Sequence, residues 1–461
     1  MVARWRALAA DKWVLFALLA ALFVRLIPLI IWPQFECVRD ECIYRSIANK
    51  IVEGEGLTVS SKGWLPAPGY PYLLALSKVV TGSMQGVKWI QVGVSCVSLL
   101  WLTSIADRVG GRSVARWSAW LFALNPTIAW FTNTLWIETI YIFLLIGAIE
   151  FVLAAREDGT LVSAAWSGAF LGVAVLFRGV ATYLPPIFLL AMVWPTSGRL
   201  SDLPGEAKRR VKVGGALLLA TVLVVAPWSL YASPRQGGFL VSDATVGHVL
   251  YLGNNDFPPL TFDYGNGMLT GPLYSRYLRT GRLPCPRDQP PVLSSRCEVD
   301  EATKWILDNP ADFVERVPMR LAQLVNPNSF LTRHVRWGYW QGLPWWGKEG
   351  LCLVVVAFGV AIQVGGAMGA WARAGGAFAW VTLGTTLYTV AASAVMYGMT
   401  RFRLPLEPLL TVYLAILLAS PKAVLTDLVA SPLRLGGAVV TSVGLVALML
   451  WYLPAGFPMF W

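Results

Sequence analysis

Long apolar runs alternate with shorter polar segments over most of the chain. Each run holds about 16–22 residues, close to the length at which an α-helix crosses the hydrocarbon core of a bilayer. No small-residue cleavage site follows the first run, so we interpret it as a retained helix rather than a signal peptide. The predicted membrane spans are residues 13–32, 87–106, 116–132, 136–154, 161–177, 180–195, 212–232, 350–371, 377–398, 404–420 and 434–453.

Composition supports this pattern. Of the 461 residues, 56% are hydrophobic and 14% are charged, whereas a soluble domain has about 25% charged residues. The net charge of +11 could indicate a nucleic-acid partner, but in a membrane protein surplus Lys and Arg gather in the cytoplasmic loops. We therefore predict an all-α integral membrane protein of about 11 spans, with a range of 10–13, and no nucleic-acid partner.

The basic residues of the short loops predict the orientation. They are Arg4, Arg6 and Lys12; Arg108, Arg112 and Arg116; Arg199, Lys208, Arg209, Arg210 and Lys212; Arg373; and Lys422 and Arg434. All of them fall on one side only if the apolar run 69–84 does not cross the membrane, so we interpret that run as a juxtamembrane or re-entrant helix. The N-terminus is then inside and the C-terminus outside.

This orientation divides the chain into three regions. An N-terminal membrane module (1–232) contains a first external loop at 33–68, an external region follows at 233–348, and C-terminal membrane helices occupy 349–461. Cys285 and Cys297 bracket a polar, Pro-rich segment of the external region and predict a disulfide. Cys37 and Cys42 could also pair, although their short separation constrains the geometry.

The sequence offers little support for metal or nucleotide chemistry. It has two histidines, His248 and His334, no CxxC pair, and no Gly-rich phosphate loop with its lysine. A zinc site and an ATP-driven pump are therefore not indicated. We expect no obligatory cofactor, with a divalent metal left open.

An acidic pair, Asp40 and Glu41, follows the first span. The segment "DECIYRSIANKIVEG" has the spacing of an amphipathic helix on the membrane surface, and Gly54 and Gly56 are predicted to end it. An isolated pair of this kind commonly lies in a solvated loop or in the first turn of a helix, where acidic residues are favourable. Held at the interface, however, such a carboxylate is a candidate general base for a lipid-borne substrate.

Seven motifs in a fixed order resemble the bacterial GT-C glycosyltransferases of the protein mannosyltransferase-like family, and the layout is similar to that of the transferases that add aminoarabinose to lipid A. They are "RDECIYRSIANKIVEGEG", "PAPGYPYLLAL", "NPTIAWFTNTLWIETIYIFLL", "GVAVLFRGVATYLPP", "APWSLYASPRQGGFLVSDATVGHVLYLGNND", "WILDNPADFVERVPMRL" and "RFRLPLEPLL". The resemblance covers residue 35 to about residue 415 and implies a GT-C-type helical bundle in the bacterial inner membrane.

The resemblance also implies a reaction on the outer face. A sugar carried on a polyprenyl phosphate would pass, with inversion, to a hydroxyl of a lipid, glycan or protein acceptor. Asp40 matches the family's catalytic aspartate and Glu41 its partner. Because the leaving phosphate is anionic, cations near the outer face are candidates for its stabilisation. These are Arg401, Arg403, Arg178 and Lys62. Further candidates for substrate contact are Tyr44, Arg45, Tyr70, Glu138, Asn254, Asn255 and His334.

Several of these residues also have a plainer explanation. Arg401 and Arg403 could extend to the membrane interface, Glu138 could pair with an arginine of a neighbouring helix, and His334 could be an exposed loop residue. Where many relatives read "PW-x-x-R-N", this chain has "PWSLYA", and a lysine of the lipid A enzymes is missing, which argues against assuming their substrates. A transporter or flippase and a non-catalytic GT-C-like subunit remain alternative functions.

Overall fold

The computed structural model describes residues 2–31, 37, 40–58, 65–194, 203–256, 285–286, 289–336, 342–373 and 375–456. These residues form helices and no strands, as the sequence predicted. Within these residues, eight helices are long and apolar enough to cross a membrane, and the apolar helices Leu161–Phe177 and Gly179–Val193 are shorter. All eleven predicted spans fall on helices, while their exact number stays a prediction. The chain is a multi-pass membrane protein.

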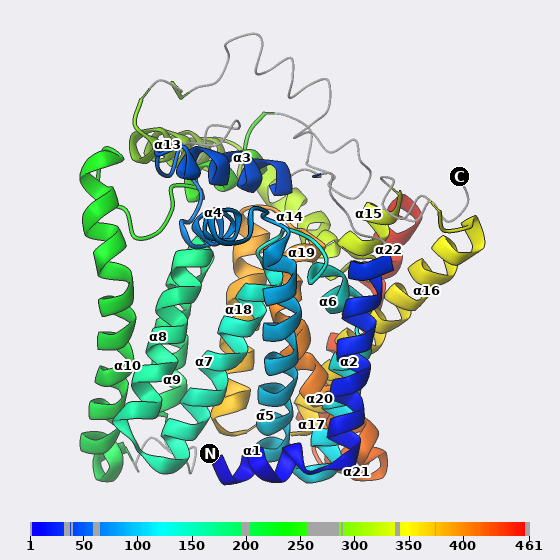
Figure 1. Cartoon of the computed structure of the whole chain (residues 1–461). Coiled ribbons are helices and arrows are strands. Elements are labelled where there is room, and N and C mark those ends of the chain that lie inside the picture. The colour runs from blue at the N-terminus through cyan, green and yellow to red at the C-terminus, as the bar shows by residue number, and fades with distance from the viewer. Residues whose placement is uncertain are drawn as a thin grey trace.

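The long helices form one bundle (Figure 1). They are α2 (Lys12–Ile31), α5 (Gly86–Leu124), α7 (Glu138–Asp158), α8 (Leu161–Phe177), α9 (Leu184–Val193), α10 (Leu203–Ala232), α16 (Trp345–Val360), α17 (Gly366–Ala372), α18 (Gly376–Val395), α20 (Glu407–Ala419) and α22 (Pro432–Gly456).

Shorter elements lie at the ends of the bundle or join its helices. They are α1 (Val2–Ala9), α3 (Asp40–Val52), α4 (Gly69–Thr81), α6 (Pro126–Phe131), η1 (Gly179–Tyr183), η3 (Ser233–Arg235), α11 (Val246–Gly253), α13 (Pro291–Asp308), α14 (Pro310–Val325), α15 (Phe330–Arg336), η5 (Ala361–Gly365), α19 (Thr400–Arg403), η6 (Leu404–Leu406) and α21 (Pro421–Val429).

Helix α5 is a hairpin of two helical arms. A straight helix of its 39 residues would measure about 58 Å, far more than the roughly 30 Å hydrocarbon core. Gly111 breaks it, with φ of 80° and ψ of −175°, a conformation that suits glycine. The two arms lie side by side. Arg25 of α2 contacts both, through Ser95 Oγ in the first arm and the Ala123 carbonyl in the second. The predicted span 87–106 lies in the first arm, whereas the predicted span 116–132 covers the second arm only to Leu124 and continues through α6.

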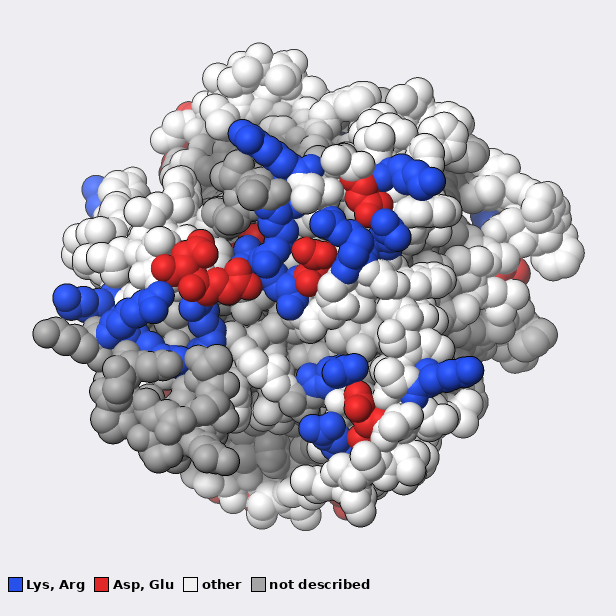
Figure 2. Space-filling model, turned by 90° about the horizontal axis from the view of Figure 1, so that it is seen from below, with Lys and Arg blue, Asp and Glu red and all other residues white. Residues whose placement is uncertain are grey.

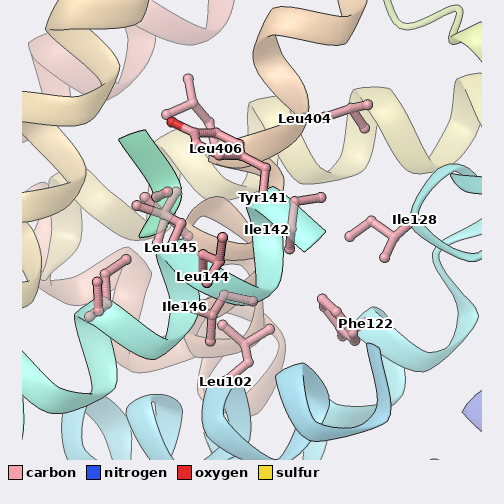
Figure 3. Packing of buried hydrophobic residues seen from close by; sticks show 14 of the residues in the cluster. Leu102, Phe122, Ile128, Tyr141, Ile142, Leu144, Leu145, Ile146, Leu404 and Leu406 are labelled. Atoms are coloured by element: carbon pink, nitrogen blue, oxygen red, sulfur yellow. The ribbon is translucent and has the colours of Figure 1, made fainter. Parts of the chain in front are cut away.

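The centre of the bundle is α7, which is buried on all sides. Figure 3 shows its side chains Ile142, Leu145 and Ile146 among residues of α5 and of the chain near Leu404. A helix that is apolar all round is expected at such a central position. Its first residue is the fully buried Glu138, so α7 places a carboxylate inside the end of the bundle that carries α3.

Helices α3, α4 and α13 lie across one end of the bundle (Figure 1). Helix α3 starts at Asp40 and ends before Gly54 and Gly56, both of which have positive φ, as the sequence predicted. Helix α4 does not run along the bundle, in agreement with the prediction that 69–84 does not cross the membrane. This end of the bundle, which carries α3 and which the sequence predicts to be external, is called the external end below.

Charged side chains collect at the opposite end, where α1 and α21 lie (Figures 1 and 2). They pair across elements: Arg4 lies 3.2 Å from Glu157, Arg116 2.8 Å from Asp11, and Arg373 3.3 Å from Asp427. Arg434 of the fifth predicted basic loop donates to the Ala372 carbonyl at the end of α17, so the first, second, fourth and fifth loops have members at one end. The third also does, since Arg210 donates to the carbonyl of Val193 at the end of α9.

Candidate functional site

A cavity of about 470 Å³ lies beneath the external elements. Its wall is formed by side chains from α3, the start of α7, η1, α11, α18 and α19, elements far apart in the sequence. The lining is mostly apolar and aromatic, with a small number of charged groups, which is typical of ligand sites. Four of the predicted residues line it, namely Asp40, Tyr44, Arg178 and Arg401.

Two arginines and two carboxylates form a continuous chain of ion pairs beside this cavity. Asp40 Oδ2 lies 2.7 Å from Arg401 Nη1, and Glu138 Oε1 lies 2.9 Å from Arg401 Nε. The same Glu138 oxygen lies 3.7 Å from Arg178 Nη1. Arginine suits this role because its planar guanidinium remains charged and can contact several oxygens at once. We call these four residues the cavity charge cluster.

Aromatic rings hold the two guanidinium groups in place. The Arg401 guanidinium lies over the Trp136 ring at 4.7 Å, and that of Arg178 lies 5.3 Å from Tyr141 and 5.7 Å from Phe402. A cation over a desolvated ring gains on the order of 1–2 kcal/mol. The arginines are therefore fixed with their charge at the cavity wall, where an anionic group could replace a carboxylate as their partner.

Helix α3 places its two acidic residues in different environments. The side chain of Asp40 is 23% exposed and faces the cavity. Glu41 is 1% exposed and accepts a hydrogen bond of 3.3 Å from the Leu135 backbone N–H. Of the pair, only Asp40 has an open side toward a substrate, so the geometry favours Asp40 for proton transfer and Glu41 for holding α3 against the start of α7.

Two tyrosines support the floor beside α3. Tyr44 and Tyr70 meet edge to face with ring centres 5.4 Å apart, and the Tyr70 hydroxyl donates to Gln91 Oε1 at 3.0 Å. Burial raises the pKa of both Tyr44 and Tyr70 above the ordinary value, so both remain neutral donors. Tyr44 lines the cavity, whereas Tyr70 supports it from behind.

Arg403 lies elsewhere, on the other side of α19. Its Nη1 donates to the carbonyls of Leu324 (3.0 Å) and Asn326 (2.6 Å), and its Nη2 lies 3.4 Å from Glu407 Oε1. It is 3% exposed and does not line the cavity. These contacts tie the end of α14 to α20. The alternative that Arg401 and Arg403 extend to the membrane interface does not apply, because both are held inside the protein.

Asn254 and Asn255 also lie outside the cavity lining and bind backbone carbonyls instead. Asn254 donates to the carbonyls of Leu250 and Val395, and its Oδ1 accepts from Arg320 Nη2 at 3.0 Å. Asn255 donates to Tyr251. These hydrogen bonds hold the end of α11 in place. Asn254 and Asn255 therefore support the part of the cavity wall that α11 forms.

Three further predicted residues have other positions. His334 is fully buried and accepts from Trp130 Nε1 at 2.8 Å, so the interpretation as an exposed loop histidine is wrong. Arg45 is half-buried on α3 and is not part of the lining. Lys62 lies outside the described residues.

Two cavity residues were not singled out from the sequence. Asp243 accepts from the N–H and hydroxyl of Thr245, and burial raises the pKa of its carboxyl. The pattern "SDAT" before an apolar run is a helix-start signal that could have located it. His248 Nδ1 lies 3.3 Å from Glu298 Oε1. No sequence signal links His248 to Glu298, because their pairing depends on how α13 packs on α11.

Two disulfides stand near the site. One joins Cys285 to Cys297, the residue before Glu298, and the other joins Cys37 to Cys42 on either side of Asp40 and Glu41. In the described part of the chain, no three His, Cys, Asp or Glu side chains converge to hold a metal ion.

Comparison with known proteins agrees with the resemblance seen in the sequence. Residues 66–230, less than half of the chain, match the family described as dolichyl-phosphate-mannose-protein mannosyltransferase. This stretch contains Glu138 and Arg178 but neither Asp40 nor Arg401. No curated protein matches the sequence.

Solved structures show the fold. The oligosaccharyltransferase of Archaeoglobus fulgidus is 15% identical, with a TM-score of 0.52 over 97% of this chain and 56% of its own. This chain therefore spans little more than half of that protein. ArnT of Cupriavidus metallidurans is 13% identical over 90% of this chain and 79% of its own, with a TM-score of 0.40. The predicted GT-C-type bundle is confirmed by the first of these likenesses.

Proposed function

We propose that this protein is an inverting glycosyltransferase that moves a sugar from a polyprenyl phosphate to an acceptor hydroxyl, in the cavity at the external end. The observation that carries the proposal is the cavity charge cluster, in which Asp40 and two arginines face one largely apolar space. A lipid-linked phosphate needs cations beside an apolar wall, and the attacking hydroxyl needs a base. The match to a family named for a lipid-phosphate sugar supports this choice of donor.

The chemistry assigns one task to each charge. Asp40 accepts the proton of the acceptor hydroxyl while the oxygen of that hydroxyl forms a bond to the anomeric carbon. The bond from that carbon to the phosphate oxygen breaks on the opposite face, and the polyprenyl phosphate leaves. Arg401 and Arg178 stabilise the charge that develops on it. Glu138 keeps the two guanidinium groups side by side.

Arg401 has a second effect, on the base itself. It is paired with Asp40 at 2.7 Å, which stabilises the carboxylate and makes it a weaker base. A donor phosphate bound to Arg401 competes with this pairing. Asp40 then becomes a better base only when the donor is in place, so that donor binding and base activation are coupled.

The acceptor and the cellular setting are part of the same proposal. In the external region, α14 packs on α18 and α22, and α13 packs on α11. A region of this length is too short for a separate acceptor domain, which favours a lipid-linked or small acceptor. The basic end would face the cytoplasm of a bacterial inner membrane, with the cavity on the outer side.

The test is transfer from a synthetic polyprenyl-phosphate sugar by the purified protein in detergent. Asp40→Asn should lower turnover about 10²–10⁴-fold, the range for a positioned general base, with donor affinity nearly unchanged. Arg401→Ala should weaken donor binding and turnover together. Glu53→Gln, an exposed acidic change just after α3, serves as the matched control.

An Asp40→Asn enzyme with near-normal turnover would end the assignment of Asp40 as the base. If the wild-type protein binds the donor but transfers nothing to any hydroxyl acceptor, the non-catalytic alternative is favoured instead.

A further inference from the structure

A disulfide closes a short loop around the acidic pair. Cys37 is bonded to Cys42 with their Cα atoms 5.0 Å apart, and Asp40 and Glu41 lie between them. Helix α3 begins at Asp40, so Cys42 is in its first turn. The bond therefore fixes where the chain enters the helix, which is also where the proposed base is attached.

The acidic pair needs such a fixed entry because its members have different partners. Asp40 reaches Arg401 of α19, 361 positions away in the sequence, while Glu41 accepts from the backbone of Leu135 before α7. Two neighbouring side chains can meet both partners only in a narrow range of backbone positions. A small rotation of the first turn would move the Asp40 carboxylate away from the cavity.

We propose that the Cys37–Cys42 disulfide is a positioning element for Asp40, and that it makes turnover sensitive to thiol reductants. This inference rests on the proposed function. A dithiol such as dithiothreitol reduces the bond by exchange: it gives two protein thiols and becomes a cyclic disulfide itself. The released α3 entry then holds Asp40 less well. A misplacement of about 1 Å at a reacting group can cost on the order of 10²-fold in rate.

The experiment uses a background in which the other disulfide is absent. Cys285→Ser/Cys297→Ser leaves Cys37–Cys42 as the one disulfide among the described cysteines, since Cys96 and Cys352 are free. Dithiothreitol should lower kcat of this background by about 10–100-fold, with donor affinity changed by less than about twofold. Reoxidation should restore kcat. Adding Cys37→Ser/Cys42→Ser should give the same low kcat with or without reductant.

A double-mutant cycle separates positioning from general structural support. If the disulfide acts through the Asp40 carboxylate, its removal should have little further effect on the residual turnover of Asp40→Asn. If it only stabilises the fold, the two losses should multiply. Multiplicative losses, or a kcat that is unchanged by reduction, would overturn the positioning role.

The outcomes keep the two proposals distinct. A background protein that transfers sugar but does not respond to reductant contradicts the positioning role alone. A wild-type protein that transfers no sugar contradicts the proposed function, and the positioning role with it.

Discussion

Glu138 is the carboxylate that brings the two cavity arginines together. It is fully buried, and its Oε1 is 2.9 Å from Arg401 and 3.7 Å from Arg178. With Asp40, the cavity charge cluster has two positive and two negative groups and no net charge. Removing one member of a buried cluster leaves an uncompensated charge, which costs more than the pair itself contributes.

This balance predicts a stability change that a phosphate can reverse. Glu138→Gln leaves two arginines facing one carboxylate, and should lower stability on the order of 3 kcal/mol. A short-chain polyprenyl phosphate should raise the Tm of this variant in detergent more than that of the wild type, because the anion replaces the lost charge.

Glu407→Gln is the matched control, since it breaks the pair with Arg403 outside the cavity. It should also lower the Tm, but the lipid phosphate should raise its Tm no more than that of the wild type. An equal response of the Glu138 and Glu407 variants would show that the phosphate does not replace the charge lost at Glu138.

His248 allows a similarly direct prediction. Its Nδ1 faces Glu298 at 3.3 Å, while the residue also lines the cavity. His248→Asn retains a polar group near the Nδ1 position, and His248→Gln retains one near the Nε2 position. If Nε2 contacts a substrate hydroxyl, the Asn variant should raise an apparent KM about tenfold, and the Gln variant should raise it less. Steady-state kinetics with each substrate varied in turn decides this, and equal effects of the two variants would contradict it.

At the scale of the element, α19 shows what the sequence could and could not predict. The sequence predicts "RFR" as a cationic segment near the site, and Arg401 lines the cavity. Residues two positions apart on a helix do not share a face, so one of Arg401 and Arg403 had to point away from the cavity. The spacing alone could not say which, because the choice depends on where α7 and the end of α14 lie.

Helix α5 carries a prediction of its own. Gly111 has φ of 80°, where any other residue is strained, and a Cβ there would meet no neighbouring atom within 4 Å. Gly111→Ala should therefore destabilise the protein by about 1 kcal/mol through the backbone alone. At Gly93, in the first arm of the same helix, an added Cβ would also meet no atom within 4 Å, but the backbone there is helical. Gly93→Ala should be neutral or slightly stabilising.

Thermal unfolding in detergent compares these two glycine variants. A Gly111→Ala protein as stable as Gly93→Ala would mean that the hairpin does not require a left-handed residue at this turn.

At the scale of the whole molecule, the fold followed from the sequence more readily than the site. The length of the apolar runs predicted the bundle helices, because a segment that crosses lipid must satisfy its backbone hydrogen bonds within itself. The pairing of Asp40 with Arg401 joins the start of the chain to its last quarter, and no local pattern encodes it. The same holds for His248 and Glu298. These contacts depend on how the helices pack together, which the spacing of hydrophobic residues within one helix does not specify.

The two ends of the bundle differ in charge, and this difference predicts how the protein sits in the membrane. Members of five basic loops lie at the end shown in Figure 2, whereas the cavity charge cluster lies at the other. Lys and Arg in short loops remain on the cytoplasmic side. Asp158 ends α7 at the basic end and Thr303 lies on α13 at the external end, and both are exposed.

In intact cells, an impermeant maleimide should label Thr303→Cys and should label Asp158→Cys only after permeabilisation. The wild-type protein serves as the blank for its own cysteines. The reverse pattern would place the cavity on the cytoplasmic side, and the lipid-linked donor would then have to be supplied from that leaflet.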